Sequence, residues 1–356
     1  MINLFRLKGI SSRIWKSILL VLMILFLVVG TKLFMLYRDI YSANVDLDGK
    51  KKSFLFIRTG AEIPEILDSL EQNGWIRNKR SLQWVMEKKN YASHIHAGRY
   101  LLVDGMSNNV LVNLLRSGMQ TPISLTFNNT RTVEEFAGKI ASQIEPDSVT
   151  ILNYLKDGDY LSQYGFTPAS SIGMFIPNTY QVYWNINADG FFRRMYKEYL
   201  AFWSVNRLKK AEKVGLSPKE IGVLASIVDE ETIMNDEKSK VAGVYVNRLK
   251  RKIRLQADPT LKFALGDFTI RRILNQHKKI DSPYNTYKYR GLPPGPIRQP
   301  SITGIDAVLN YQTHRYLYFC AKPDFSGYHV FARTLKEHNR NARKYQNALN
   351  KERIYR

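Results

Sequence analysis

The chain has 356 residues, of which 44% are hydrophobic. It contains 53 lysines and arginines but only 31 aspartates and glutamates, which gives a formal net charge of +22. This hydrophobic content excludes a globally disordered chain and suffices for two or three packed domains. The single cysteine, Cys320, excludes a disulfide within the chain and a zinc site built on cysteines. The charge indicates attraction to an anionic lipid surface or an acidic polymer. No nucleic-acid-binding motif accompanies it, so we do not expect nucleic acid as a partner.

The N-terminus predicts a membrane anchor. Residues 17–37 form an apolar span of about 20 residues, interrupted only by Lys32, and this is the length that a helix needs to cross a bilayer. A lysine near a helix end can extend its ammonium to the interface. Residues 1–16 hold four basic residues and no acidic one, so the positive-inside rule predicts a cytoplasmic tail and an extracytoplasmic chain after Arg38. A cleaved signal peptide is the alternative, but bulky residues occupy positions 34–36, where a cleavage site needs small ones.

A charged stalk is expected at residues 38–52, followed by a small α+β module at residues 53–121. Its pattern predicts a strand at 53–57, a helix ending near Gly74, a helix at 81–89, a strand at 98–103 and a short helix at 108–116. A module of this size is better suited to binding than to catalysis.

Residues 122–356 are expected to form a larger, mixed α+β domain. A strand at 123–127 and a helix capped by Thr132 open it, and an aromatic-rich, mostly helical stretch follows to about residue 208. Helices are predicted from Ser217 and over 238–250, then loops rich in proline and glycine, two strands near 316 and 328–332, and a basic helix from Thr334. The fold class is therefore α+β with one N-terminal transmembrane helix.

Three consecutive carboxylates end the apolar stretch Leu224-Ala-Ser-Ile-Val-Asp-Glu-Glu-Thr232. If this stretch is helical, Glu231 lies above the apolar positions 224, 227 and 228, whereas Asp229 lies over small residues and Glu230 falls between. Burial against apolar side chains raises a carboxyl pKa, which a general acid needs in order to hold its proton near neutral pH. The spacing favours Glu231 as that acid. The simpler interpretation is a helix that ends in a solvated acidic turn.

Further motifs follow in one order along the chain. They are Ser226-Ile-Val-Asp-Glu-Glu-Thr232, Asn247-Arg-Leu249, Arg254-Leu-Gln-Ala-Asp-Pro-Thr260, Tyr284-Asn-Thr-Tyr287, Gly291-Leu-Pro-Pro-Gly-Pro-Ile297, and His329-Val-Phe331 with His338-Asn339. In this order they resemble the endolytic murein transglycosylases, the YceG-like family, over about residues 53–350. The family's acidic motif reads Ile-(Val/Ile)-Glu-Lys-Glu-Thr, and its second glutamate, the catalytic one, corresponds to Glu231. The resemblance and the helical spacing select the same residue.

Three departures from the family pattern stand out. Asp229 replaces the first glutamate of the acidic motif and Glu230 replaces its lysine, a loss of positive charge that we expect to raise the pKa of the catalytic acid. The family's Glu-Gly-x-Arg is Asn128-Asn-Thr-Arg131 here, so only its arginine carries over. The family's Phe-x-Pro-Asp-Thr-Tyr has Asn178 in place of the aspartate. These changes put substrate contacts in question more than the chemistry.

The resemblance implies cleavage of the β-1,4 bond between N-acetylmuramic acid and N-acetylglucosamine within peptidoglycan strands, leaving a 1,6-anhydro-muramyl end. One carboxyl group can serve first as acid and then as base in such a reaction, without water, metal or cofactor. The resemblance also implies termination of glycan elongation at the bacterial inner membrane, cell-wall synthases as partners, and a LysM-like glycan-binding module at 53–121 beside the catalytic domain at 122–356.

The other candidate site residues are expected to bind substrate or to support the acid. Asp258, before a proline, is alternatively an ordinary turn former and helix cap. The stretch 284–287 suits sugar rings but also core packing, and Arg248 is expected to pair with an acid of the 229–231 cluster. Gln256 and Asn285 are candidates to stabilise positive charge on the sugar. The full set is Arg131, Asn178, Asp229, Arg248, Gln256, Asp258, Tyr284, Asn285, Thr286 and Tyr287.

Two alternatives remain open from the sequence. A muramidase that uses water would need a second carboxylate, for which Asp229 and Asp258 are the candidates. A membrane-anchored scaffold that binds peptidoglycan without cleaving it is the other. The departures at positions 128, 178 and 230 leave it open, whereas the retention of Glu231 argues against it. Reducing muramic acid ends, anhydro-muramyl ends or no cleavage distinguish the three.

Overall fold

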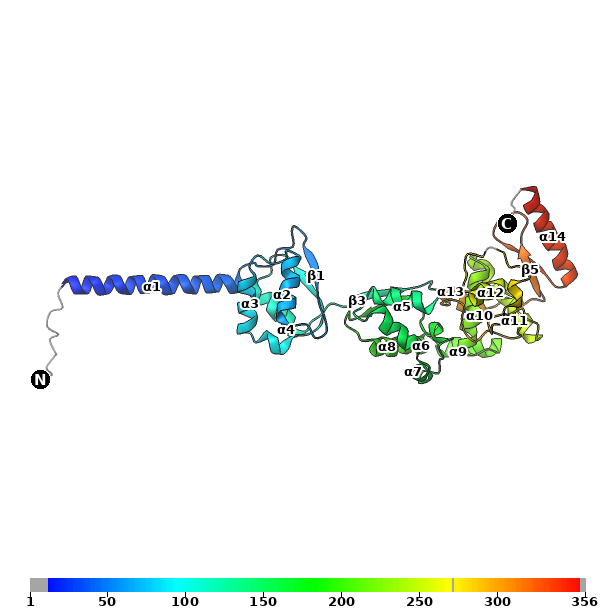
Figure 1. The fold of residues 1–356 in the computed structure, drawn as a ribbon, viewed down its shortest axis with the longest axis horizontal. Coiled ribbons are helices and arrows are strands. Elements are labelled where there is room, and N and C mark those ends of the chain that lie inside the picture. Colours follow the sequence, from blue (N-terminus) through cyan, green and yellow to red (C-terminus); the bar gives the residue numbers. More distant parts are fainter. Residues whose placement is uncertain (1–11, 271, 353–356) are drawn as a thin grey trace. The chain divides into compact units, whose positions relative to one another are not determined.

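The computed structural model describes residues 12–270 and 272–352, so most of the predicted cytoplasmic tail, residues 1–16, lies outside the described residues. The chain divides into two compact units (Figure 1). One comprises Met1–Pro122 with Tyr183–Asn185, and the other comprises Ile123–Val182 with Ile186–Arg356. The fold is mixed α+β, as the sequence predicts.

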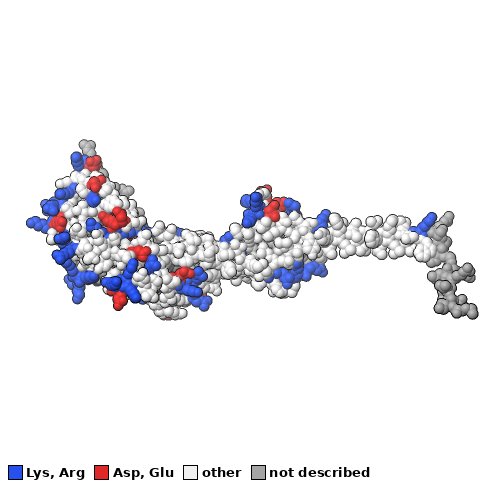
Figure 2. Space-filling view, turned by 180° about the vertical axis from the view of Figure 1, so that it is seen from behind, with Lys and Arg blue, Asp and Glu red and all other residues white. Residues whose placement is uncertain are grey.

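Helix α1 (Ser12–Tyr41) is long and apolar enough to cross a membrane. Its side chains are exposed from Ile14 to Arg38, and Figure 2 shows an uncharged surface along much of its length. The helix continues beyond the predicted span of 17–37, because its last turn packs against helices α3 (Lys79–Lys88) and α4 (Asn108–Ser117) of the same unit. Ile40 contacts the core of that unit, and the carbonyl oxygen of Asp39 accepts a hydrogen bond from the Asn108 amide at 2.8 Å.

The small module of the first unit follows α1. Its elements are β1 (Lys52–Ile57), α2 (Ile63–Gln72), α3 (Lys79–Lys88), the 3-10 turn η1 (Tyr91–His94), β2 (Gly98–Val103) and α4 (Asn108–Ser117). Strands β1 and β2 pair antiparallel, with Ile57 opposite Gly98, and the helices cover them around a core that includes Tyr91 and Tyr100.

Residues 38–52 are not a free stalk but part of this module. Val45 and Leu47 are buried in its core, and Val45 forms a β-bridge with Ile76. The stretch carries enough charge to suggest solvent exposure. However, its apolar residues alternate with polar ones, which is the pattern of a half-buried extended segment.

The second unit contains the remaining elements. They are β3 (Ile123–Phe127), α5 (Val133–Ala141), α6 (Ser148–Lys156), α7 (Gly158–Ser162), η2 (Ser171–Met174), β4 (Asn178–Val182), α8 (Ala188–Phe202), α9 (Val205–Val214), α10 (Pro218–Glu231), α11 (Asn235–Lys250), α12 (Asp258–Leu265), η3 (His277–Lys279), α13 (Ile302–Leu309), β5 (Tyr318–Ala321), β6 (His329–Ala332) and α14 (Leu335–Lys351). Strand β3 pairs antiparallel with β4, and β5 with β6. Aromatic rings of Phe127, Phe136, Phe175 and Phe191 fill the core beside β3 and β4.

Helix α10 lies at the centre of the rest of this unit and packs against α9, α11, α12 and α13. Every residue from Ile221 to Asp229 is buried, so the helix is surrounded by protein on all sides. The proline-rich loop crosses it, since the backbone N–H of Ile297 donates to the Ser226 hydroxyl at 3.0 Å. Gly295 is required in this loop, because a Cβ there would lie 1.7 Å from the carbonyl oxygen of Ala169.

Candidate active site

The three carboxylates lie at the C-terminal end of α10. The helix begins with a capping box between Ser217 and Glu220 and with Pro218 in its first turn, so its start is fixed by local chemistry. Consecutive residues of a helix point about 100° apart. Asp229, Glu230 and Glu231 therefore enter three different surroundings.

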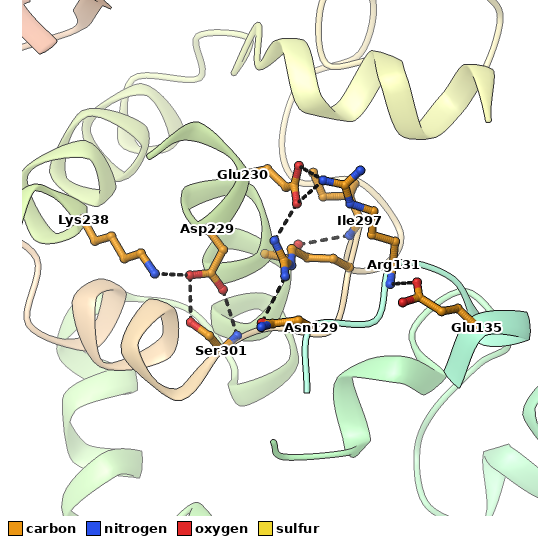
Figure 3. Close-up of polar contacts among 10 residues, drawn as sticks. Asn129, Arg131, Glu135, Asp229, Glu230, Lys238, Ile297 and Ser301 are labelled. Carbon is orange, nitrogen blue, oxygen red and sulfur yellow. Dashed lines mark hydrogen bonds and ion pairs between the residues drawn. The ribbon is translucent and has the colours of Figure 1, made fainter. Parts of the chain in front are cut away.

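Asp229 is an anchor between helices. Its carboxylate accepts a bond from the Lys238 ammonium at 2.7 Å, from the Ser301 backbone N–H at 2.8 Å and from the Ser301 hydroxyl at 2.8 Å (Figure 3). The side chains of Asp229 and Lys238 are only 4% and 9% exposed. Since Lys238 lies on α11 and Ser301 caps α13, this carboxylate joins both helices to α10.

Glu230 binds two arginines from segments far apart in the sequence. Arg298 approaches it at 2.6 Å and Arg131 at 3.4 Å, and Figure 3 shows the Arg131 guanidinium directed at this carboxylate. Arg298 also donates to Asn129 at 3.2 Å, so the β3–α5 loop and the proline-rich loop meet at this point. The negative charge that replaces the family's lysine is thus matched by positive charge.

Glu231 opens into a cleft of about 370 Å³. Its Oε1 atom accepts a hydrogen bond from the Tyr245 hydroxyl of α11 at 2.5 Å. The pKa of Glu231 is raised to about 7, mainly by burial; the Tyr245 hydrogen bond acts to lower it, and the negative charge of Asp258 acts to raise it. The raised pKa agrees with the apolar helix face predicted from the spacing. Such a carboxyl group is protonated for part of the time at neutral pH and can act as acid and base.

Polar and aromatic side chains form the walls of this cleft. The Tyr287 hydroxyl donates a hydrogen bond to Asp258 at 2.5 Å. Asp258 is the first residue of α12, and its side chain is exposed. Gln256 adopts a left-handed backbone conformation with φ +52°, and its side-chain oxygen accepts from Arg248 at 3.2 Å. The lining residues are Glu231, Tyr245, Arg248, Leu255, Gln256, Asp258, Tyr287, Tyr318, Phe319, Leu335 and His338.

Arg248 does not pair with a carboxylate of the acidic cluster, although the sequence predicts such a pair. Its guanidinium donates to the carbonyl oxygens of Leu317 at 2.6 Å, Leu255 at 2.8 Å and Arg254 at 3.0 Å. No ion pair of Arg248 with a carboxylate occurs among the described residues. The arginine shapes the loop after α11 and contributes a positive charge that lowers the pKa of Glu231.

The other predicted residues lie outside the cleft lining. Asn285 and Thr286 are buried and hold loop backbone, since Asn285 donates to the Ile280 carbonyl at 2.7 Å and Thr286 accepts from the Ala257 N–H at 3.0 Å. Tyr284 packs against Phe263, with 4.7 Å between ring centroids. Two further candidates complete the set. Arg131 contacts Glu230, and Asn178 is exposed on β4.

Six lining residues were not among the sequence candidates: Tyr245, Leu255, Tyr318, Phe319, Leu335 and His338. The rings of Tyr318 and His338 stack, with 5.4 Å between centroids, and Arg248 lies over the Tyr318 ring at 5.0 Å. Burial and the charge of Arg248 lower the pKa of His338. Tyr245 lies two residues before the Asn247-Arg motif, the one signal that could have drawn attention to it.

Metal ligands are not gathered at this cleft. Across residues 12–270 and 272–352, no group of three or more His, Cys, Asp or Glu side chains has an arrangement that could hold an ion. His329, from the last family motif, is engaged elsewhere, because its Nδ1 contacts the Glu237 carboxylate at 2.6 Å.

Comparison with known proteins supplies the family. The pattern that defines the YceG-like family matches residues 55–344. The endolytic murein transglycosylase of Bacillus subtilis (strain 168) is 29% identical over 322 residues, which cover 86% of this chain and 88% of the relative. The endolytic murein transglycosylase of Streptococcus pneumoniae serotype 2 is 26% identical over 343 residues, which cover 85% of this chain and 60% of the relative.

A solved structure agrees. The crystal structure of a putative YceG-like protein from Listeria monocytogenes superposes with a TM-score of 0.54 at 27% identity, covering 82% of this chain and 99% of that one. The matched family pattern spans both the small module and the carboxylate cleft. This chain belongs to the YceG-like family.

Proposed function

We propose that the chain is a membrane-anchored endolytic murein transglycosylase and that Glu231 is its acid–base residue. The observation that carries the proposal is a partly buried carboxyl group with a pKa of about 7 at a polar cleft. The names of the relatives and the family membership support the same activity.

The proposed reaction breaks the β-1,4 bond between N-acetylmuramic acid and N-acetylglucosamine within a strand. Protonated Glu231 gives its proton to the glycosidic oxygen as the bond to the muramic C1 breaks. The resulting carboxylate takes the proton of the muramic C6 hydroxyl, whose oxygen bonds to C1 and closes the 1,6-anhydro ring. Acid and base are restored in one residue, and no water is consumed.

Positive charge that develops on the sugar ring needs a nearby anion or oriented dipole. Asp258 is suited to this role, because it is exposed in the same cleft and its carboxylate is oriented by the Tyr287 hydroxyl. The Gln256 amide is held through its oxygen by Arg248, which leaves its N–H groups free to meet an acetamido oxygen of the glycan.

The N-terminal unit is suited to tether the catalytic unit to a membrane. We place the N-terminus in the cytoplasm and the cleft outside the inner membrane, on the basis of the basic residues before α1. A LysM-like module at residues 53–121 would hold glycan, and its covalent link to both α1 and the catalytic unit would raise the effective concentration of enzyme at new strands. The family resemblance adds the proposed role, which is termination of glycan elongation beside cell-wall synthases.

Muropeptide analysis tests the proposal. The full-length chain in detergent is incubated with purified peptidoglycan, and the products are identified by mass spectrometry beside those of Glu231→Gln. Anhydro-muramyl ends that disappear in the variant are expected. Reducing muramic acid ends would instead indicate a muramidase with Asp258 as its second carboxylate, and intact strands with the wild-type chain would overturn the enzymatic proposal.

A further inference from the structure

The hydrogen bond from Tyr245 makes the two carboxyl oxygens of Glu231 inequivalent, because only Oε1 accepts it. Tyr245 is 2% exposed and its hydroxyl donates to Oε1. We propose that Tyr245 is a positioning residue that keeps the transferable proton of Glu231 on Oε2, facing the substrate. This inference rests on the proposed function and concerns the same site.

The tyrosine is itself held firmly in place. Phe319 of β5 packs edge-on against its ring, with 5.9 Å between centroids. Lys238 lies seven residues earlier on α11, which is two helical turns and hence the same side of the helix. The Lys238–Asp229 ion pair and the Tyr245–Glu231 hydrogen bond therefore fasten the end of α10 to one side of α11 at two levels.

The chemistry follows from the single proton of a phenol. Burial raises the pKa of Tyr245 well above its ordinary value, and the nearby Glu231 charge raises it further, so the hydroxyl remains a donor. An oxygen that accepts this bond is the carbonyl-like oxygen of the protonated carboxyl group. The acid proton is then on Oε2 and passes from there to the glycosidic oxygen.

The same bond acts again after the first proton transfer. Once Glu231 is a carboxylate, the bond from Tyr245 becomes charge-assisted and stronger. It therefore stabilises the ionised form and opposes the effect of burial on the pKa of Glu231. Without the hydroxyl, the carboxyl group would ionise at higher pH and rotate between two equivalent orientations.

The test compares Tyr245→Phe with wild type in the full-length chain in detergent. Tyr180→Phe is the matched control, because Tyr180 is also a buried tyrosine, whose hydroxyl donates to the Ile176 carbonyl at 2.6 Å, and it does not line the cleft. Two quantities are measured: the titration of the Glu231 carboxyl carbon by 13C NMR, identified by its loss in Glu231→Gln, and the pH profile of anhydro-muramyl product formation.

We expect Tyr245→Phe to raise the titration midpoint of Glu231 by about one pH unit. We expect kcat to fall about 10- to 100-fold, with the alkaline limb of the profile displaced to higher pH. Tyr180→Phe should leave both the midpoint and the limb unchanged. A midpoint and profile in Tyr245→Phe that superimpose on wild type would overturn the inference.

Failure of the inference and of the proposed function are distinguishable. The NMR titration reports the hydrogen bond even if no anhydro product forms, whereas product analysis of the wild type alone decides the reaction. If Tyr245→Phe does not fold, 3-fluorotyrosine at position 245 replaces it. That residue keeps the hydroxyl and donates more strongly, so it should lower the midpoint, and an unchanged midpoint would contradict the inference.

Discussion

Replacing Asp229 with asparagine should destabilise the second unit without removing any group from the cleft. Asparagine has nearly the same shape but leaves the Lys238 ammonium, 9% exposed, without its counter-charge. Only uncharged acceptors remain for it, namely the asparagine side-chain oxygen and the Thr303 hydroxyl at 3.2 Å. Removal of one member of a buried ion pair costs about 3–5 kcal/mol, because the other charge stays buried and unpaired.

In a domain of this size each kcal/mol lowers the unfolding midpoint by about 2–4 °C. We therefore expect Asp229→Asn to unfold about 6–20 °C below wild type in thermal melts of the full-length chain. The double variant Asp229→Asn with Lys238→Met removes the unpaired charge and should recover part of the loss. Its unfolding free energy should exceed the value expected from adding the two single changes.

Cleavage by Asp229→Asn, assayed well below its unfolding temperature, should stay close to wild type, since its carboxylate does not line the cleft. An Asp229→Asn variant that melts at the same temperature as wild type would refute the stabilising role of the Asp229–Lys238 ion pair. Cleavage that disappears while the fold remains intact would contradict the prediction as well, because Asp229 would then take part in the chemistry, as a water-activating carboxylate would.

Two further predictions concern the neighbouring carboxylates. Glu230→Lys places a positive charge against Arg298 and Arg131 and should lower the free energy of unfolding by about 1–3 kcal/mol. Adding Arg298→Glu to this variant should restore part of the lost free energy, measured in urea melts. Strictly additive losses from the two changes would contradict the pairing. Glu231 has a folded pKa of about 7, above its ordinary 4.5, so the folded state holds a proton that the unfolded chain has lost between these values. Stability from this group is complete below pH 4.5 and should fall by up to about 3 kcal/mol as pH rises through 7. Glu231→Gln should lack this fall, and equal pH slopes in the two proteins would refute the raised pKa.

Local periodicity explains why the sequence indicated the environment of Glu231. A helix turns by a fixed angle at each residue, so the neighbours of Glu231 on its own helix follow from spacing alone. Positions 224, 227 and 228 are indeed fully buried. Partners from other segments do not follow from spacing. Tyr245, the partner of Glu231, is 14 residues away from it, and Arg298, the partner of Glu230, is 68 residues away. Such contacts depend on how the helices and loops pack.

The polar family motif at 284–287 shows a second limit. Among the described residues of the stretch 267–300, which are all but residue 271, little regular secondary structure occurs, so backbone groups there need side-chain partners. Asn285 and Thr286 supply these partners from buried positions, although amides and hydroxyls in a motif equally suggest substrate contacts. Only Tyr287 of this motif lines the cleft, and sequence spacing does not distinguish these uses.

The different surroundings of the three adjacent carboxylates bear on whether the site contains one catalytic carboxyl group, as a transglycosylase needs, or two, as a hydrolase needs. Asp229 is occupied by Lys238 and Ser301, and Glu230 by two arginines, so neither is free to activate a water at the cleft. Glu231 alone of the three combines burial with access to the cleft, and Asp258 is the other carboxylate there. Since the Asp258 carboxylate is held by Tyr287 and is exposed, it suits stabilisation of positive charge better than proton transfer. A site with one carboxyl group that can carry a proton and one fixed anion supports the proposed ring closure, in which a single residue acts first as acid and then as base, and product analysis decides between that reaction and hydrolysis.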